Sequence, residues 1–139
     1  MKPQELRIGN LVCYNGKVVK VKQITKHKIG YHTKPNETRM NYARLCDIEP
    51  IPITEELLLK IGFKRDRNGY FSHKEYNDEL SIRFSPIYTF IEYANLHFNP
   101  EDVTETNYGS SLEFPNTLHL HTLQNIWYLL TGKELEIKL

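Results

Sequence analysis

Two histidines, His119 and His121, have the spacing in this sequence that most resembles a chemical site. On a strand they would share one face, and two imidazoles so placed can ligate one zinc ion. A catalytic zinc needs a third protein ligand, for which His73 and His97 are the other downstream histidines. In the alternative interpretation a strand ends at His119 and a helix begins near His121, where the helix dipole favours the neutral imidazole. We favour this second interpretation and expect no metal and no other cofactor.

Other catalytic patterns are missing from the sequence. It contains no Gly-x-Ser-x-Gly nucleophile turn and no glycine-rich phosphate loop. The carboxylate pairs Glu55–Glu56 and Glu101–Asp102 are adjacent in sequence, so their side chains diverge instead of converging on one bond. We therefore expect a non-enzymatic protein with no catalytic residues.

The composition is typical of a soluble globular protein. The chain has 139 residues, of which 40% are hydrophobic and 25% are charged. No apolar run is long enough to span a bilayer, and the first ten residues lack the apolar core of a signal peptide. These features predict a cytoplasmic protein, in which Cys13 and Cys46 would be free thiols in or near the core.

Charge is divided sharply along the chain. Residues 1–46 carry ten lysines and arginines against two acids, Glu5 and Glu37, a net charge of +8. Residues 47–139 carry eight lysines and arginines against fifteen acids, a net charge of −7. The division predicts a basic domain over residues 1–50 and an acidic α+β domain over residues 51–139, with the boundary at "CDIEPIPIT".

The basic half has the pattern of a small antiparallel barrel. Asn15-Gly16 is a strong hairpin signal, because both central residues of a type I′ turn need positive φ. An alternation that slips near Val18-Val19 predicts a bulge or a bend in a shared strand. The expected strands cover residues 11–14, 17–25, 28–33 and 38–45. Four short strands within about fifty residues indicate an SH3-like barrel.

The acidic half predicts two helices around an antiparallel meander. Thr54 is placed to cap a helix that ends near Gly62. Strands follow, and residues 99–116 are expected to form a long polar loop. A last helix presents an apolar stripe, which Ile126 and Leu129 flank on the helix surface, and it stops at Gly132. Residues 133–139 are expected to return as a terminal strand. The stripe consists of Leu120, Leu123, Trp127 and Leu130.

The basic half also supplies the candidate binding residues. Lysines that neutralise phosphates bind nucleic acid in a salt-sensitive way, and Tyr31 would stack on an unpaired base. The same lysines would equally suit an acidic protein, another copy of this chain, or the acidic domain itself, or they would simply keep strand edges soluble. We expect a protein partner first, with nucleic acid as the alternative and no membrane contact. The candidate residues are Lys17, Lys20, Lys22, Lys26, Lys28, Tyr31 and Arg39, with the loop of residues 99–116 as a second surface.

Three blocks of the sequence resemble a known family. They are "ELRIGNLVCYNGKVVKV", "DIEPIPITEELLLKIGF" and "HTLQNIWYLLTGKELEI", in the same order. Together they are similar to short uncharacterised proteins encoded in gut Bacteroidales genomes, phages and mobile elements. The resemblance implies an accessory protein that acts by binding host or phage macromolecules, including inhibition of a host defence system. It implies no catalytic residue.

Overall fold

The computed structural model describes residues 1–75, 78–84, 88–95, 111–115 and 118–138. The chain forms two compact units, which we call unit 1 and unit 2. Unit 1 contains residues 1–52 and 119–126, and unit 2 contains residues 53–118 and 127–139. The sequence-based domains were 1–50 and 51–139, so residues 119–126 lie in the other unit from the one expected. In the described part of the chain no helix has the length and apolar character to cross a bilayer.

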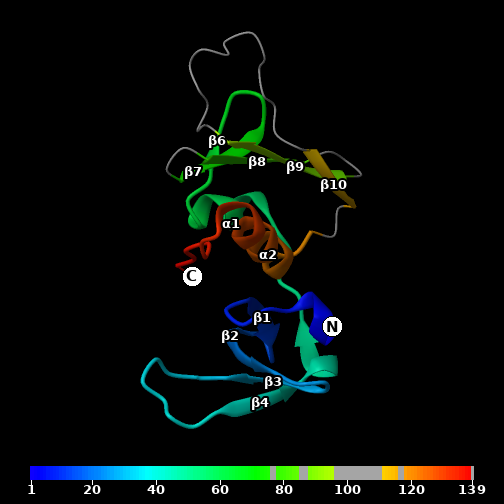
Figure 1. Cartoon of the computed structure of the whole chain (residues 1–139), viewed down its shortest axis with the longest axis vertical. Coiled ribbons are helices and arrows are strands. Elements are labelled where there is room, and N and C mark those ends of the chain that lie inside the picture. The colour runs from blue at the N-terminus through cyan, green and yellow to red at the C-terminus, as the bar shows by residue number, and fades with distance from the viewer. Residues whose placement is uncertain (76–77, 85–87, 96–110, 116–117, 139) are drawn as a thin grey trace. The chain divides into compact units, whose positions relative to one another are not determined.

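Unit 1 is built on a curled, five-stranded antiparallel sheet (Figure 1). Its strand order is β4-β3-β2-β1-β5. The strands are β1 (Leu11–Tyr14), β2 (Lys17–Ile24), β3 (Lys28–Tyr31), β4 (Asn41–Arg44) and β5 (Ile48–Glu49). Two short 3-10 turns, η1 (Pro3–Glu5) and η2 (Leu45–Asp47), complete it, and η2 begins where the fourth strand had been expected to continue.

The β1–β2 hairpin forms as its sequence predicts. Asn15 and Gly16 both have positive φ, 49° and 72°, and Tyr14 pairs with Lys17 across the turn. Strand β2 pairs with β1 through its first half and with β3 through its second half, as expected of a shared strand. The register shift lies between Val21 and Gln23, three residues beyond the predicted position. At that position the alternation is intact, because Val18 faces outward and Val19 inward.

The inward side chains of the curled sheet form the core of unit 1. Val12, Val21 and Ile29 are fully buried, and Ala43 from β4 lies beside Ile29 in register. The side chains that alternate with them along the strands lie on the opposite face, which we call the outer face of the sheet. It carries Val18, Lys20, Gln23, Lys28, Gly30, Tyr42 and Arg44.

Helix α1 (Glu55–Lys60) of unit 2 begins and ends where the sequence predicts. The Thr54 hydroxyl accepts a hydrogen bond from the Leu57 amide, which satisfies one donor of the first turn. Gly62 follows the helix with φ of +99°, a conformation that favours glycine. Leu58 and Ile61 are buried on the apolar face.

Unit 2 also contains a five-stranded antiparallel sheet. Its order, β10-β9-β8-β7-β6, is that of a meander and confirms the predicted α+β class. The strands are β6 (Lys64–Arg65), β7 (Tyr70–Glu75), β8 (Asp78–Phe84), β9 (Tyr88–Asn95) and β10 (Ser111–Pro115). The prediction that residues 99–116 form a loop is wrong for Ser111–Pro115, because these residues form β10 and pair with Tyr88–Glu92 of β9. Residues 96–110 lie outside the described residues.

Helix α2 (Leu120–Thr131) is the predicted closing helix. Leu120, Leu123 and Trp127 are almost fully buried, as their stripe predicts. Leu129 is 82% exposed, which leaves it off the buried face that it was expected to flank. The helix stops at Gly132, whose amide donates to the Tyr128 carbonyl at 2.8 Å. Residues 133–138 form no strand, so the predicted terminal strand is wrong.

Candidate binding surface on the curled sheet

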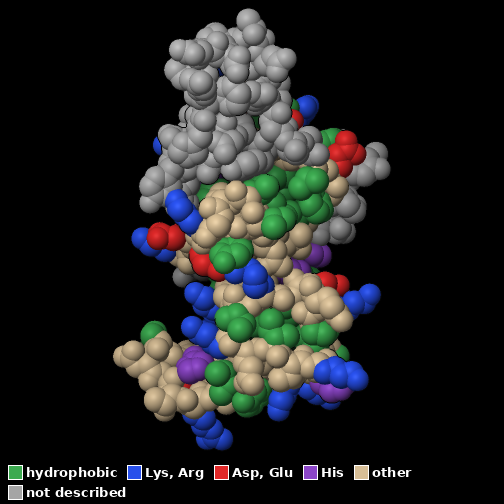
Figure 2. Space-filling model, in the orientation of Figure 1, with side chains coloured by type: hydrophobic (Ala, Val, Ile, Leu, Met, Phe, Trp, Pro, Cys, Tyr) green, Lys and Arg blue, Asp and Glu red, His purple; other side chains and the backbone are tan. Residues whose placement is uncertain are grey.

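The candidate lysines of unit 1 are all exposed. Unit 1 carries ten lysines and arginines against four acids, Glu5, Glu37, Asp47 and Glu49, which gives a net charge of +6. Figure 2 shows cationic side chains at several places on this part of the molecule, separated by apolar and uncharged ones. Within the described residues of unit 1, no ion pair involves Lys17, Lys20, Lys22 or Lys26. Their charges are therefore available to a partner.

These lysines do not gather on a single strand. Lys20 lies on the outer face of β2, and Lys22 occupies the register shift two residues later. Lys26 lies in the turn between β2 and β3, and Lys28 begins β3 on the outer face. Arg39 is exposed in the connection from β3 to β4. Positive charge is thus spread along β2, the turn after it and the start of β3 instead of being concentrated at one point.

Tyr31 is not the exposed stacking residue that the sequence suggested. It is 9% exposed and packs in the core of unit 1, with its ring edge-on to Tyr14 at 5.8 Å between centroids. Burial raises the pKa of its phenol, with smaller contributions from Tyr14 and Glu37. A base could not stack on a ring buried in this way. The prediction failed because Tyr31 lies on the same face of β3 as Ile29, two residues earlier, and this face packs into the core.

Tyr42 is the aromatic residue that the outer face exposes. Its side chain is 47% exposed, and the Lys28 ammonium lies 4.2 Å from the ring centroid in a cation–π contact. The Tyr42 hydroxyl donates to the Gln23 side-chain carbonyl at 3.2 Å. Gly30 lies beneath this cluster, where a Cβ would come within 2.9 Å of the Met40 side chain. Glycine therefore lets Met40 lie flat against the strand.

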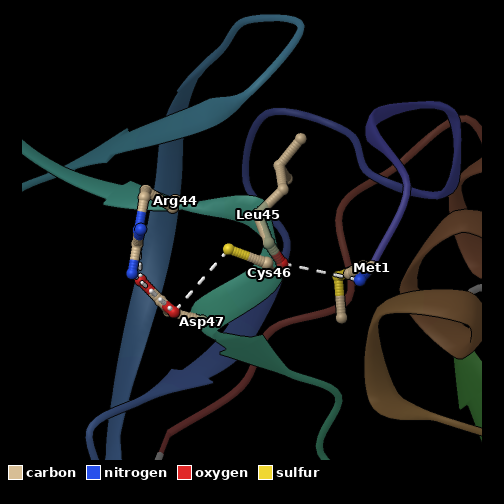
Figure 3. A network of polar contacts seen from close by, with 5 residues as sticks. All are labelled: Met1, Arg44, Leu45, Cys46 and Asp47. Atoms are coloured by element: carbon tan, nitrogen blue, oxygen red, sulfur yellow. Dashed lines mark hydrogen bonds and ion pairs between the residues drawn. The ribbon is translucent and has the colours of Figure 1, made fainter.

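Arg44 differs from the lysines because it is already paired. Its guanidinium donates to both oxygens of Asp47, at 2.8 and 3.3 Å, and this hydrogen bonding lowers the pKa of the Asp47 carboxyl (Figure 3). Cys46 is exposed, with its Sγ 3.7 Å from Asp47 Oδ1. The expectation that this thiol lies in or near the core is wrong, because η2 turns its side chain outward. Cys13 is partly buried.

Glu37 fixes the connection between β3 and β4. Its Oε2 accepts hydrogen bonds from the Thr33 amide at 2.7 Å, the Thr33 hydroxyl at 2.6 Å and the Asn41 side chain at 3.2 Å. The Thr33 hydroxyl bond is the largest cause of a pKa lowered to about 2, and the Thr33 amide bond comes next. The carboxylate thus serves as the centre of the loop, and its hydrogen-bonding capacity is used within the loop.

A pocket of about 300 Å³ opens between the β1–β2 hairpin and the segment that follows β3. Its lining combines aromatic and aliphatic side chains with one cation. The lining residues are Tyr14, Asn15, Lys17, Val18, Val19, Tyr31, His32 and Thr33. Of these, Lys17 and Tyr31 were among the candidate binding residues predicted from sequence. The others could not be found that way, because the pocket joins strands that become neighbours through folding.

His119 and His121 lie at the start of α2, with rings 5.7 Å apart and nearly parallel. His121 is 4% exposed, and its Nδ1 has no hydrogen-bond partner among the described residues. Burial lowers its pKa; His119 adds to this effect and Glu5 opposes it. No three His, Cys, Asp or Glu side chains of the described residues gather closely enough to hold a metal ion. Two stacked imidazoles alone do not make the four-coordinate site that zinc prefers.

Gln124 and Asn125 join the first half of α2 to the segment before β1 within unit 1. The Gln124 amide accepts from the Leu11 amide at 2.8 Å and donates to the Gly9 carbonyl at 3.3 Å. Asn10, which is fully buried, donates to the Asn125 side chain at 2.9 Å. Gln124 thus pairs with main chain as a neighbouring strand would. This contact explains why residues 119–126 belong to unit 1.

Comparison with family models, curated proteins and solved structures gave no match at the threshold used.

Proposed function

We propose that this chain is a non-enzymatic binding protein that contacts an acidic surface of a protein partner through the basic band of unit 1. The basic band comprises Lys17, Lys20, Lys22, Lys26 and Lys28 along β2, the following turn and the start of β3, and Arg39 is a further exposed cation in the β3–β4 connection. The observation that carries the proposal is the number of exposed cations in this band that have no acidic partner within unit 1. Unpaired positive charges raise the rate of association with an acidic surface and favour acidic partners over basic ones.

A protein partner is favoured over nucleic acid because apolar side chains are exposed within the same unit. Val18 is 50% exposed on the outer face beside Lys20, and Ile8 is 58% exposed. Protein interfaces combine an apolar centre with a polar rim, whereas phosphate contacts use cations and hydrogen-bond donors and need no apolar centre. The burial of Tyr31 removes the stacking residue on which the nucleic-acid hypothesis had relied.

We extend the proposal to the class of protein. The curled sheet of unit 1 would be an SH3-like barrel, a fold that serves many unrelated binding functions. The chain would act in a phage or mobile-element context, as its resemblance to short Bacteroidales proteins implies, and would bind a host or phage protein. In this role it would need no cofactor and would work in the cytoplasm.

Charge reversal tests which surface carries the binding. We expect the triple variant Lys20→Glu, Lys22→Glu, Lys26→Glu to weaken binding of a labelled peptide rich in Asp and Glu by more than tenfold, measured by fluorescence anisotropy at physiological salt. A matched control reverses three exposed lysines of unit 2, Lys60, Lys64 and Lys138, and should leave binding within about twofold. Equal loss in both variants would show that only net charge matters and would contradict the proposal.

Nucleic acid is the second candidate, and one observation favours it. The exposed Tyr42 ring with Lys28 beside it combines a stacking surface with a cation that could contact phosphate. If this candidate is correct, Tyr42→Ala should weaken binding of labelled single-stranded DNA by about tenfold. This change corresponds to about 1.4 kcal/mol, which lies within the roughly 1 to 3 kcal/mol that one stacked base contributes. Unchanged DNA affinity in this variant would remove the observation that supports it.

A further inference from the structure

We infer that the 300 Å³ pocket of unit 1 receives one bulky apolar side chain from an extended, acidic segment of the partner protein. The inference rests on the proposed function, because it assumes that the partner is acidic. It adds the place where that partner is anchored and the kind of residue that anchors it. Interfaces concentrate their binding energy in a few such anchors seated in pockets.

The floor of the pocket is largely apolar and packed into the core of unit 1. Tyr31 and Val19 belong to the core of unit 1, where each is 9% exposed. Tyr14 meets Tyr31 edge-on, with ring planes inclined at 60° and centroids 5.8 Å apart. A ligand that enters the pocket therefore meets aromatic and aliphatic atoms that are already ordered, and their immobilisation adds no entropic cost to binding.

One wall of the pocket is held in place by Glu37. This carboxylate binds both the amide and the hydroxyl of Thr33, a lining residue, and also the Asn41 side chain. Because all three hydrogen-bond donors belong to the β3–β4 connection and its junction with β4, the Glu37 carboxylate is used within its own loop. The opposite wall is the β1–β2 hairpin, which the positive-φ pair Asn15 and Gly16 fixes.

The rim of the pocket carries positive charge. Lys17 is exposed and lines the pocket. Lys20 lies on the other face of β2 from the core-facing Val19 and is not a lining residue. An extended segment that places an apolar residue in the pocket would bring a flanking residue against Lys17, in a unit whose net charge is +6. Acidic flanking residues would complement this positive charge, which selects an acidic segment over a basic one.

The size of the pocket selects a side chain over a cofactor. Small-molecule sites span roughly 300 to 1,000 Å³, so this pocket lies at the lower limit of that range. Aromatic anchors such as Phe combine a large contact area with few rotatable bonds, and aromatic walls favour them through edge-to-face contacts. Phe is therefore the residue to place in a test ligand.

The test uses two peptides with identical acidic flanks and either Phe or Ala at the centre. Each is titrated into the full-length chain while backbone amide resonances are followed by NMR. We expect the Phe peptide to shift the resonances of Asn15, Lys17, Val18 and Thr33 and to bind at least about tenfold more tightly than the Ala peptide. Val18→Ser, an exposed substitution that should not disturb folding, is expected to reduce this preference for Phe.

Three results would overturn the inference in distinguishable ways. If both peptides bind equally and shift only the resonances of Lys20, Lys22 and Lys26, the pocket is not an anchor but the proposed function stands. If neither peptide binds, the proposed function and the inference fail together. If single-stranded DNA shifts the pocket resonances more strongly than either peptide, the pocket belongs to a nucleic-acid surface.

Discussion

Gln124 shows how a single side chain can take the place of a strand. Its amide pairs with the Gly9 carbonyl and the Leu11 amide, both main-chain groups that would otherwise lack these partners. Its true partners are more than a hundred residues away in sequence, so no local pattern could identify them.

We predict that Gln124→Ala destabilises the protein by about 1 to 3 kcal/mol, because it leaves two partly buried main-chain groups without these hydrogen bonds. Chemical denaturation followed by circular dichroism measures this change. The same substitution at the exposed residue Gln4 serves as the control and should change the free energy of unfolding by less than about 0.5 kcal/mol. A Gln124→Ala variant as stable as that control would show that the contact contributes nothing.

His121 is expected to make stability depend on pH. Burial, with His119 adding to it and Glu5 opposing it, lowers the pKa of His121 in the folded state below its ordinary value of 6.5. The unfolded chain therefore binds the proton more readily, and the free energy of unfolding should fall as pH drops below about 6.5. Equilibrium unfolding measured between pH 7.5 and 5 should show this decrease, and it should be smaller in His121→Asn. A His27→Asn control, at an exposed histidine, should keep the decrease of the wild type.

At the scale of elements, short-range signals predicted much of the structure. The Asn15-Gly16 turn, the Thr54 cap and the apolar stripe of α2 depend on residues within a few positions, and each forms as expected. Strand β10 was missed because a short strand is stabilised by its neighbour β9 and not by its own sequence. Tyr31 was assigned to the surface for a similar reason, because its burial depends on how β2 and β3 pair.

The β3–β4 connection supplies a prediction at this scale. Thr33→Val removes the hydroxyl that contributes most to the low pKa of Glu37 and keeps the amide that contributes next. We expect the midpoint of the Glu37 carboxyl titration, followed by NMR, to rise from about 2 toward its ordinary value of 4.5. Because the folded pKa is lowered, the contact favours folding above about pH 4.5 and is lost as pH falls toward about 2. An unchanged midpoint would contradict the assigned role of the hydroxyl.

In the whole molecule, the change from basic to acidic sequence and the boundary between the two compact units fall at different residues. The sequence changes from basic to acidic near residue 46, and unit 1 ends at Pro52 before it regains residues 119–126. The charge change could be read directly from composition. The return of residues 119–126 could not, because it depends on the contacts of Gln124 and Asn125 with distant main chain. Of the candidate site, the exposed lysines were predicted from sequence, whereas Tyr42 and most of the pocket required the fold.

A competition experiment distinguishes an acidic protein partner, which we propose, from nucleic acid. The acidic Phe peptide is bound to the chain at physiological salt, and single-stranded DNA of equal net charge is titrated in. We expect the DNA to displace the peptide only at concentrations more than about tenfold above those at which unlabelled peptide does so. Displacement by DNA at equal or lower concentrations would contradict the proposed function and identify the basic band as a nucleic-acid surface.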